Sequence, residues 1–168
     1  MDYYLRREEL ADINQVRALL REAFPTIAES KLVDALRANG EVVLSLVAVN
    51  EDDEVLGQIL FSPVSTTPPS EVRGVGLAPV AVRADVQSLG IGSRLIREGL
   101  RVCKELEYDY CVVLGGPKYY QRFGFEKAST FGLQNDYGVD DEFMVIRFSD
   151  RAPVGRVKYA PEFALFSV

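Results

Sequence analysis

The spacing of hydrophobic residues along the chain predicts strands and helices that alternate. Apolar side chains recur at helical spacing over residues 13–24 and 29–38, and most regularly over residues 90–106. Short apolar or β-branched runs between these helices predict strands. We expect strands at 2–6, 42–49, 55–61, 74–82, 110–114, 143–148 and 156–159, a short helix at 119–123 and an exposed loop at 65–70. This order predicts a mixed α/β sheet covered by helices, in one domain spanning residues 1–168.

Composition and charge narrow the class of protein. The chain has 19 Lys and Arg against 25 Asp and Glu, and this net charge of −6 argues against a nucleic-acid partner. The absence of histidine removes Ser-His and Cys-His nucleophile pairs and most zinc sites, so we expect no metal. No apolar run approaches the roughly 20 residues of a membrane span, and the first residues do not resemble a signal peptide. A cytoplasmic protein with no membrane partner is therefore predicted, in which Cys103 and Cys111 are buried thiols.

A glycine motif lies between a predicted strand and the longest predicted helix. It reads Gln87-Ser88-Leu89-Gly90-Ile91-Gly92-Ser93. Two glycines at the start of a helix direct unpaired backbone N–H groups, and the positive end of the helix dipole, at one small volume. Such a volume suits a phosphate group. Two glycines ahead of a helix are common, so the motif alone does not identify the ligand.

Pro79 interrupts the strand predicted at 74–82. Because proline has no N–H to donate to a strand ladder, its place there has two interpretations. It marks a bulge or an edge strand, or it marks the point where the strand parts from its neighbour. In the second case, free backbone groups are left for a ligand.

A second segment changes the interpretation of the glycine motif. Tyr120-Gln121-Arg122-Phe123-Gly124-Phe125 follows it after one helix and one apolar strand. The two segments resemble the Gln-x-x-Gly-x-Gly and Tyr-x-x-x-Gly-Phe motifs of the GNAT superfamily of N-acetyltransferases. The resemblance covers nearly the whole chain in element order and is specific over residues 76–125. Residues 114–125 are most similar to a bacterial branch of N-acetyltransferases whose substrates are largely unassigned. The resemblance to the superfamily implies a mostly antiparallel mixed sheet of about seven strands, with helices on both faces and two splayed central strands.

The resemblance also implies acetyl-CoA as the co-substrate and a set of binding residues. Backbone N–H groups of residues 89–93 would hold the pyrophosphate, and the glycines would allow close approach. Val80 and Val82 would present backbone groups to the pantetheine arm, and the Val80 N–H would donate to the thioester oxygen. Arg83 is equally a phosphate contact or a surface arginine. The implied cofactor-binding set is Val80, Val82, Gln87, Ser88, Leu89, Gly90, Ile91, Gly92, Ser93 and Tyr120.

Tyr120 is the predicted catalytic side chain, together with the Val80 N–H. A thiolate leaves when an amine attacks a thioester. With a thiol pKa of about 8.5 and a tyrosine pKa of about 10, protonation of that thiolate by tyrosine is uphill by about 2 kcal/mol. A positioned tyrosine therefore serves as the general acid. The alternative is a core aromatic residue with a satisfied hydroxyl. The neighbouring Tyr119 is expected to pack or to line the pocket.

The general base of many relatives, a glutamate on the strand equivalent to residues 74–82, has no counterpart here. Four carboxylates elsewhere are interpreted as solvated surface charges: Glu71, Asp136, Asp140 and Asp141. We therefore name no base, since a less basic amine, or deprotonation through ordered water, needs no dedicated residue. The loop at 131–142 is expected to border the acceptor pocket, and its acidic character favours a cationic acceptor.

The leading hypothesis is an enzyme that transfers the acetyl group of acetyl-CoA to a primary amine, small-molecule or peptide, by direct attack. The alternative is an acyl-CoA-binding or sensing module with little or no catalysis, which the missing strand carboxylate favours. A dinucleotide-dependent oxidoreductase is disfavoured, because the glycine motif comes late in the chain and no second domain is available for a substrate. A monomer and a homodimer both remain open.

Overall fold

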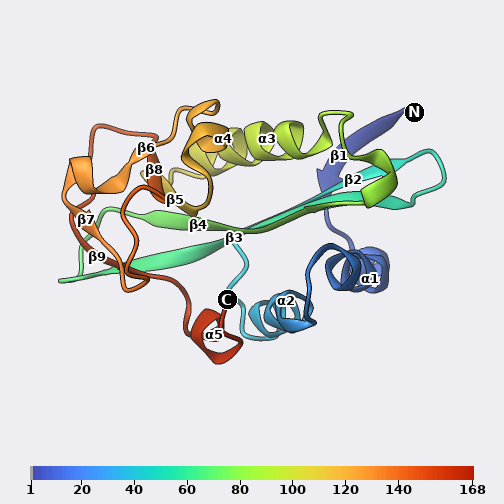
Figure 1. Cartoon of the computed structure of the whole chain (residues 1–168), viewed down its shortest axis with the longest axis horizontal. Helices are drawn as coiled ribbons and strands as arrows, with labels where there is room; N and C mark the ends of the chain where they lie inside the picture. The colour runs from blue at the N-terminus through green and yellow to red at the C-terminus, as the bar shows by residue number, and fades with distance from the viewer. Residues whose placement is uncertain (1) are drawn as a thin grey trace.

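One mixed sheet runs through the molecule, and helices cover both of its faces (Figure 1). The computed structural model describes residues 2–168. Within them the strands are β1 (Tyr3–Arg7), β2 (Leu44–Asn50), β3 (Val55–Thr67), β4 (Gly74–Val82), β5 (Tyr110–Leu114), β6 (Glu126–Lys127), β7 (Leu133–Gln134), β8 (Phe143–Arg147) and β9 (Gly155–Lys158). Their order is β1-β2-β3-β4-β5-β8-β6, and β9 pairs with β3 and β7. The β4–β5 and β7–β9 pairs are parallel and the others are antiparallel.

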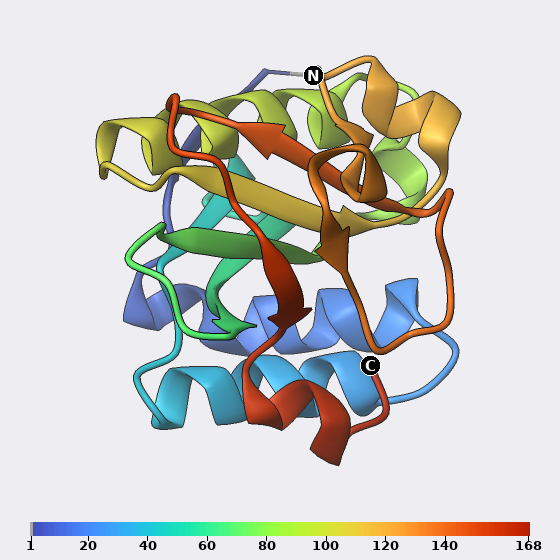
Figure 2. The ribbon, with the colours of Figure 1, turned by 90° about the vertical axis from the view of Figure 1, so that its left-hand side faces the viewer.

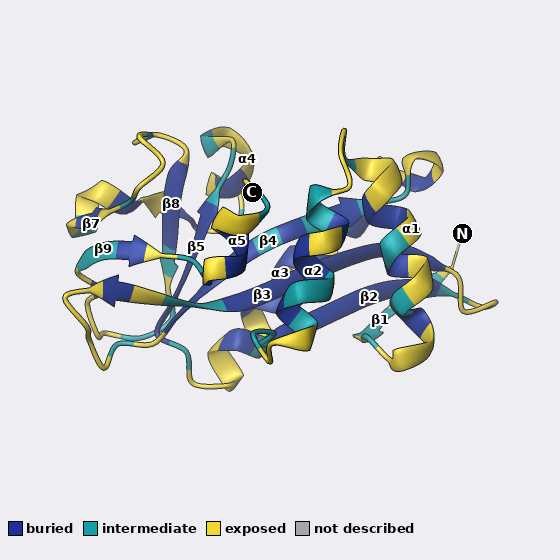
Figure 3. Ribbon diagram, turned by 90° about the horizontal axis from the view of Figure 1, so that it is seen from below, coloured by how far each residue is buried: buried dark blue, intermediate teal, exposed yellow. Residues whose placement is uncertain are grey.

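The helices form two layers. On one face lie α3 (Ile91–Glu105) and α4 (Pro117–Gln121), and on the other lie α1 (Ile13–Ala23), α2 (Ala28–Ala38) and α5 (Pro161–Leu165) (Figures 1 and 2). Each layer encloses its own apolar cluster against the sheet. Seen from the α1–α2 face, the strands beneath the helices are buried while the outer helix surfaces are exposed (Figure 3). Within residues 2–168, no helix combines the length and the apolar character needed to cross a bilayer.

Each predicted strand and helix overlaps an observed one, although the short helix expected at 119–123 lies at Pro117–Gln121. The strand at 55–61 continues to Thr67, because Ser65–Thr67 pair with Lys158–Arg156 of β9. The expected loop at 65–70 is therefore wrong for its first three residues. The short strands β6 and β7 and the helix α5 were not predicted. The seven predicted strands and the mostly antiparallel mixed sheet are confirmed.

The two central strands part as the resemblance implies. β4 and β5 pair only through Gly74–Gly76 and Tyr110–Val112. The interpretation of Pro79 as a bulge is confirmed, since the β3–β4 register shifts opposite it, between Ile59 and Phe61. The parting from β5 begins three residues earlier, after Gly76. Beyond Gly76, β4 keeps its pairing with β3 and has lost its pairing with β5. This gap positions the candidate site.

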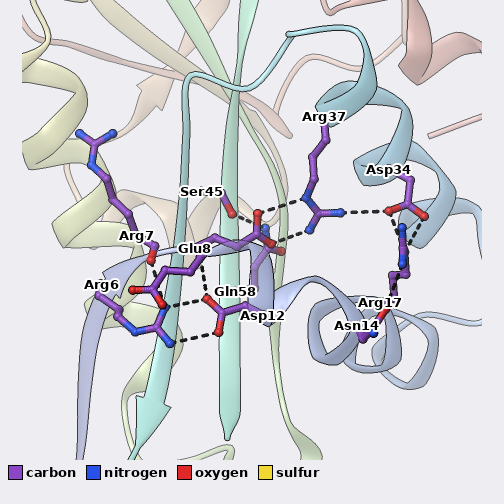
Figure 4. Close-up of polar contacts among 11 residues, drawn as sticks. Arg6, Arg7, Glu8, Asp12, Asn14, Arg17, Asp34, Arg37, Ser45 and Gln58 are labelled. Carbon is purple, nitrogen blue, oxygen red and sulfur yellow. Dashed lines mark hydrogen bonds and ion pairs between the residues drawn. The ribbon is translucent and has the colours of Figure 1, made fainter. Parts of the chain in front are cut away.

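Ion pairs fix the helices of the α1–α2 face to β1 (Figure 4). The Arg6 guanidinium donates two hydrogen bonds to the Asp12 carboxylate, at 2.6 and 3.0 Å. Those bonds hold the pKa of the buried Asp12 below its usual range. In α2, Arg37 pairs with Glu8, which follows β1, and with Asp34. The network lies on β1 and the helices, away from the parting of β4 and β5.

Candidate active site

A pocket of about 560 Å³ lies between the end of β4 and the start of α3. Its lining comes from three places in the chain: the end of β4, the glycine motif and the first turn of α4. The lining residues are Val80, Ala81, Val82, Gln87, Ser88, Gly90, Ile91, Gly92, Ser93 and Tyr119. The fold thus brings together most of the residues that sequence analysis assigned to the cofactor.

The start of α3 offers backbone donors to this pocket. Gly90 caps the helix with φ of 80°, a left-handed conformation that favours glycine. The first N–H that donates into the helix is that of Arg94, to the Gly90 carbonyl oxygen at 3.1 Å. The N–H groups of Gly90 to Ser93 precede that bond and have no helical acceptor. At Gly92 a Cβ atom would lie 3.6 Å from the Tyr119 hydroxyl, so bare backbone faces the pocket. This geometry fits an anionic group with phosphate chemistry.

The end of β4 offers a second set of backbone groups. The Arg83 N–H donates to the Leu56 carbonyl oxygen at 2.8 Å. Because antiparallel pairs alternate between bonded and non-bonded residues, Ala81 bonds to β3 whereas Val80 and Val82 point their backbone groups away from it. Those groups face the side from which β5 has parted. The Val82 carbonyl already accepts a hydrogen bond there, from the Gln87 amide at 3.2 Å.

The two tyrosines of α4 occupy different environments. Tyr119 is 38% exposed and lines the pocket, as expected. Tyr120 is 8% exposed and packs within the core, its ring centre 5.6 Å from that of Phe125. Gly115 makes room for it, because a Cβ there would lie 2.3 Å from the Tyr120 ring. Burial raises the pKa of Tyr120 to about 12, so its hydroxyl stays protonated throughout the physiological range.

Two predicted site residues do not line the pocket. Of two arginines near it, Arg83 is ion-paired, whereas Arg122 contacts the glycine motif. Leu89 is 52% exposed and Tyr120 is buried, so neither is among the lining residues. Arg83 is held by Asp85 at 2.7 Å and by Glu54 at 3.6 Å, which leaves its charge compensated. Arg122 is not among the residues predicted from the sequence, yet its guanidinium donates to the Ser93 hydroxyl at 3.3 Å. It also stacks over the Tyr119 ring, 5.1 Å from its centre.

The signal for Arg122 was present in the sequence. It follows Tyr119 by three residues, and residues three apart on a helix lie side by side. A cation beside the glycine motif was therefore predictable once the short helix had been placed. Ala81, which lines the pocket and was not predicted either, gave no such signal.

The carboxylates near the site are poor candidates for a base. Glu71 precedes β4, at the end opposite Val80, and its side chain is 97% exposed. The Asp136 carboxylate pairs with the Lys158 ammonium at 2.7 Å and with Arg156 at 3.1 Å. The hydrogen bond from Lys158 holds the pKa of Asp136 below its usual range. Asp140 and Asp141 both pair with Lys127, at 3.0 and 3.1 Å. We therefore assign none of these four carboxylates as a base.

The two cysteines are buried and free. Burial raises the pKa of Cys103 to about 12 and raises that of Cys111 well above its usual value. Because the thiolate is the reactive form, neither side chain is an effective nucleophile at neutral pH.

The fold and the pocket define an acetyltransferase architecture, in which a helix start faces two parting strands of a mixed sheet. The chain belongs to the acetyltransferase (GNAT) family, whose sequence profile matches residues 13–125. It is 37% identical over 166 residues to YhbS of Escherichia coli strain K12, described as an uncharacterized N-acetyltransferase, and the match covers 96% of this chain and 99% of YhbS. Family membership makes the protein an acyltransferase.

Two solved structures are similar over nearly the whole chain. The crystal structure of E. coli YhbS in complex with CoA matches with a TM-score of 0.91 at 36% identity, covering 96% of this chain and 92% of that one. A GNAT acetyltransferase of Brucella melitensis in complex with acetyl-CoA matches with a TM-score of 0.80 at 36% identity, covering 96% and 98%. The predicted fold is therefore confirmed.

Proposed function

We propose that the protein transfers the acetyl group of acetyl-CoA to a primary amine by direct attack. The observation that carries this proposal is the parting of β4 from β5, which leaves the backbone groups of Val80 and Val82 beside the start of α3. These backbone groups and the start of α3 together form one polar surface, along which an extended thioester ligand would bind. Relatives solved with CoA and with acetyl-CoA support the choice of that ligand.

The residues around the pocket fit the parts of such a ligand. The backbone N–H groups of residues 89–93 would bind the pyrophosphate, and the Arg122 guanidinium beside Ser93 would add a positive charge. Val80 and Val82 would bind the pantetheine arm in the manner of an added strand. The exposed side of Tyr119 would lie against the phosphate end, because its hydroxyl lies close to Gly92.

Acetyl-CoA supplies an acyl carbon activated as a thioester. In the transfer, the neutral amine forms a C–N bond, the C–S bond breaks, the nitrogen loses a proton and the sulfur gains one. The Val80 N–H would donate to the thioester oxygen as negative charge develops there. The Tyr120 hydroxyl, which burial keeps protonated, would supply the proton for the leaving sulfur.

We propose that water takes the proton from the amine. The described carboxylates near the site are ion-paired, and the thiols are buried and protonated. An alkylammonium with a pKa of about 10.4 costs about 4.6 kcal/mol to deprotonate at pH 7. The amine itself therefore sets the pH dependence. The alternative, a binding or sensing module with little catalysis, is favoured by the same missing carboxylate.

Thiol release from acetyl-CoA is expected to depend on an added primary amine and to rise with pH. Between pH 7 and pH 9, kcat/KM for the amine should increase about tenfold per pH unit. The reason is that the neutral fraction of an amine with a pKa of about 10.4 increases tenfold per pH unit in this range. Tyr120 should impose no falling limb in this range, since its acid is lost only as pH passes about 12. A thiol-trapping dye measures the rate at each pH.

The control is the same reaction without amine, which corrects for hydrolysis of the thioester. A plateau set by a group that titrates near pH 6 to 7 would instead reveal a base in the protein. Absence of amine-dependent release at every pH, in folded protein that binds acetyl-CoA, would contradict the enzyme and support the sensing module.

A further inference from the structure

A second cavity opens on the opposite face of the sheet, at the same parting of the strands. Its volume is about 160 Å³. It is lined by Leu77 and Ala78 of β4, Leu114 of β5, and Tyr137, Tyr159, Phe163 and Val168 from the loop and the end of the chain. We call it the aromatic cavity. Four of its residues also line a wider outer groove of about 320 Å³.

The aromatic cavity and the first pocket are lined by neighbouring residues of β4. Leu77 and Ala78 come directly after Gly76, the last residue of β4 that pairs with β5. Two residues further along, Val80 lines the pocket on the α3 side. Pro79 alone separates Ala78 from Val80 along the chain, so the Val80 N–H follows closely on the residues that line the aromatic cavity. A molecule held in the aromatic cavity thus needs only a short arm to reach that N–H.

Three aromatic rings line one part of the wall, and aliphatic side chains line the rest. The ring centres of Tyr137 and Tyr159 are 5.8 Å apart, and those of Tyr159 and Phe163 are 5.0 Å apart. Gly76 makes room for Tyr159, because a Cβ there would lie 2.2 Å from its ring. The volume is close to the roughly 150 Å³ of an apolar cavity that binds benzene. Size and lining therefore suit one aromatic ring.

The charges around this cavity do not favour an acceptor that carries a second positive charge besides its amine. Asp136 is the carboxylate of the outer groove, and it pairs with the Lys158 ammonium and the Arg156 guanidinium. One negative charge thus meets two positive charges. The expectation of a cationic acceptor, drawn from the acidic residues of the loop, neglected these partners. Asp140 and Asp141 of the same loop are likewise paired with Lys127.

We infer that the acceptor is a primary amine joined by a short chain to a single uncharged aromatic ring, which binds against Tyr137, Tyr159 and Phe163. This inference rests on the proposed function, because it treats the parting of β4 and β5 as the place of reaction. The ring would lie on the α5 face of the sheet, and the amine would reach through the gap toward Val80. Edge-to-face contacts with the wall would orient it.

Binding to the CoA-saturated protein tests the inference without turnover. Calorimetry would compare phenethylamine with butylamine, which lacks the ring, and with putrescine, which adds a second ammonium. Phenethylamine should bind at least about tenfold more tightly than butylamine, and putrescine should bind no better than butylamine. Equal binding of phenethylamine and butylamine, or tighter binding of putrescine, would overturn the inference, as would failure of all three to bind.

Two variants test whether the preference for phenethylamine arises at the aromatic cavity. Tyr137 is 41% exposed and lies in a loop, so Tyr137→Ala should fold normally and weaken phenethylamine about fivefold while butylamine is unaffected. Tyr4→Ala, at a 49% exposed tyrosine of β1, is the matched control and should change neither amine. An equal loss for both amines in Tyr137→Ala would contradict the ring site. Selective phenethylamine binding without acetyl transfer would instead refute the proposed catalysis and leave the ring site standing.

Discussion

Gly92→Asp is expected to fold like the wild type and to lose acetyl-CoA affinity by at least about a hundredfold. The new Cβ would meet its nearest neighbours, the Tyr119 hydroxyl and the Val82 side chain, at an ordinary 3.6 Å. A carboxylate in the first turn of a helix is favourable for the helix dipole. The same carboxylate would occupy the position of the pyrophosphate and repel it. The variant should therefore keep the stability of the wild type and lose affinity for acetyl-CoA.

Calorimetry with acetyl-CoA and thermal unfolding measure the two effects. Ser70→Asp adds the same charge in an exposed loop before β4 and serves as the control, because its side chain can keep the hydrogen bond from the Val72 N–H. It should bind acetyl-CoA like the wild type. Gly90 is the poorer test position, since its φ of 80° would add backbone strain. Wild-type affinity in Gly92→Asp would remove the start of α3 from the binding site.

Tyr120→Phe is expected to lower kcat by about 10²- to 10⁴-fold, with KM for acetyl-CoA little changed. The substitution removes the proton donor for the leaving sulfur and keeps the ring that packs against Gly115 and Phe125. Steady-state kinetics with saturating amine give both constants. Circular dichroism and thermal unfolding check that the variant is folded.

Tyr119→Phe is the matched control at the adjacent position. It removes a hydroxyl that lies near Gly92, at the phosphate end of the pocket. Its effect should therefore fall on KM for acetyl-CoA and leave kcat within about threefold of the wild type. The assignment of Tyr120 fails if the two variants lose kcat equally, or if Tyr119→Phe is the more damaging.

The sequence predicts the elements well where hydrophobic spacing is strong. The helix at 90–106 and the strands at 74–82 and 110–114 were placed within a residue or so of α3, β4 and β5. These elements carry the glycine motif and Pro79, so the position of the pocket followed from them. Local spacing is enough here because the apolar residues of each of these three elements follow a clear pattern.

What the sequence did not show depends on contacts between distant segments. The continuation of β3 to Thr67 needs a partner from β9, far along the chain. The neutralisation of Asp136 needs Lys158 and Arg156, which no pattern near the loop reveals. The aromatic cavity likewise assembles residues from β4, β5, a loop and α5. Burial of Tyr120, and with it the raised pKa, also follows from packing alone.

The fate of an isotope-labelled acetyl group tests most directly whether the protein transfers acetyl from acetyl-CoA to an amine. Labelled acetyl-CoA is incubated with the protein and phenethylamine, and mass spectrometry follows the label in the amine, the protein and free acetate. We expect one labelled amide for each CoA released, with the protein unlabelled before and after amine is added. Label that stays on the protein, or that appears only as acetate, would contradict direct transfer to the amine.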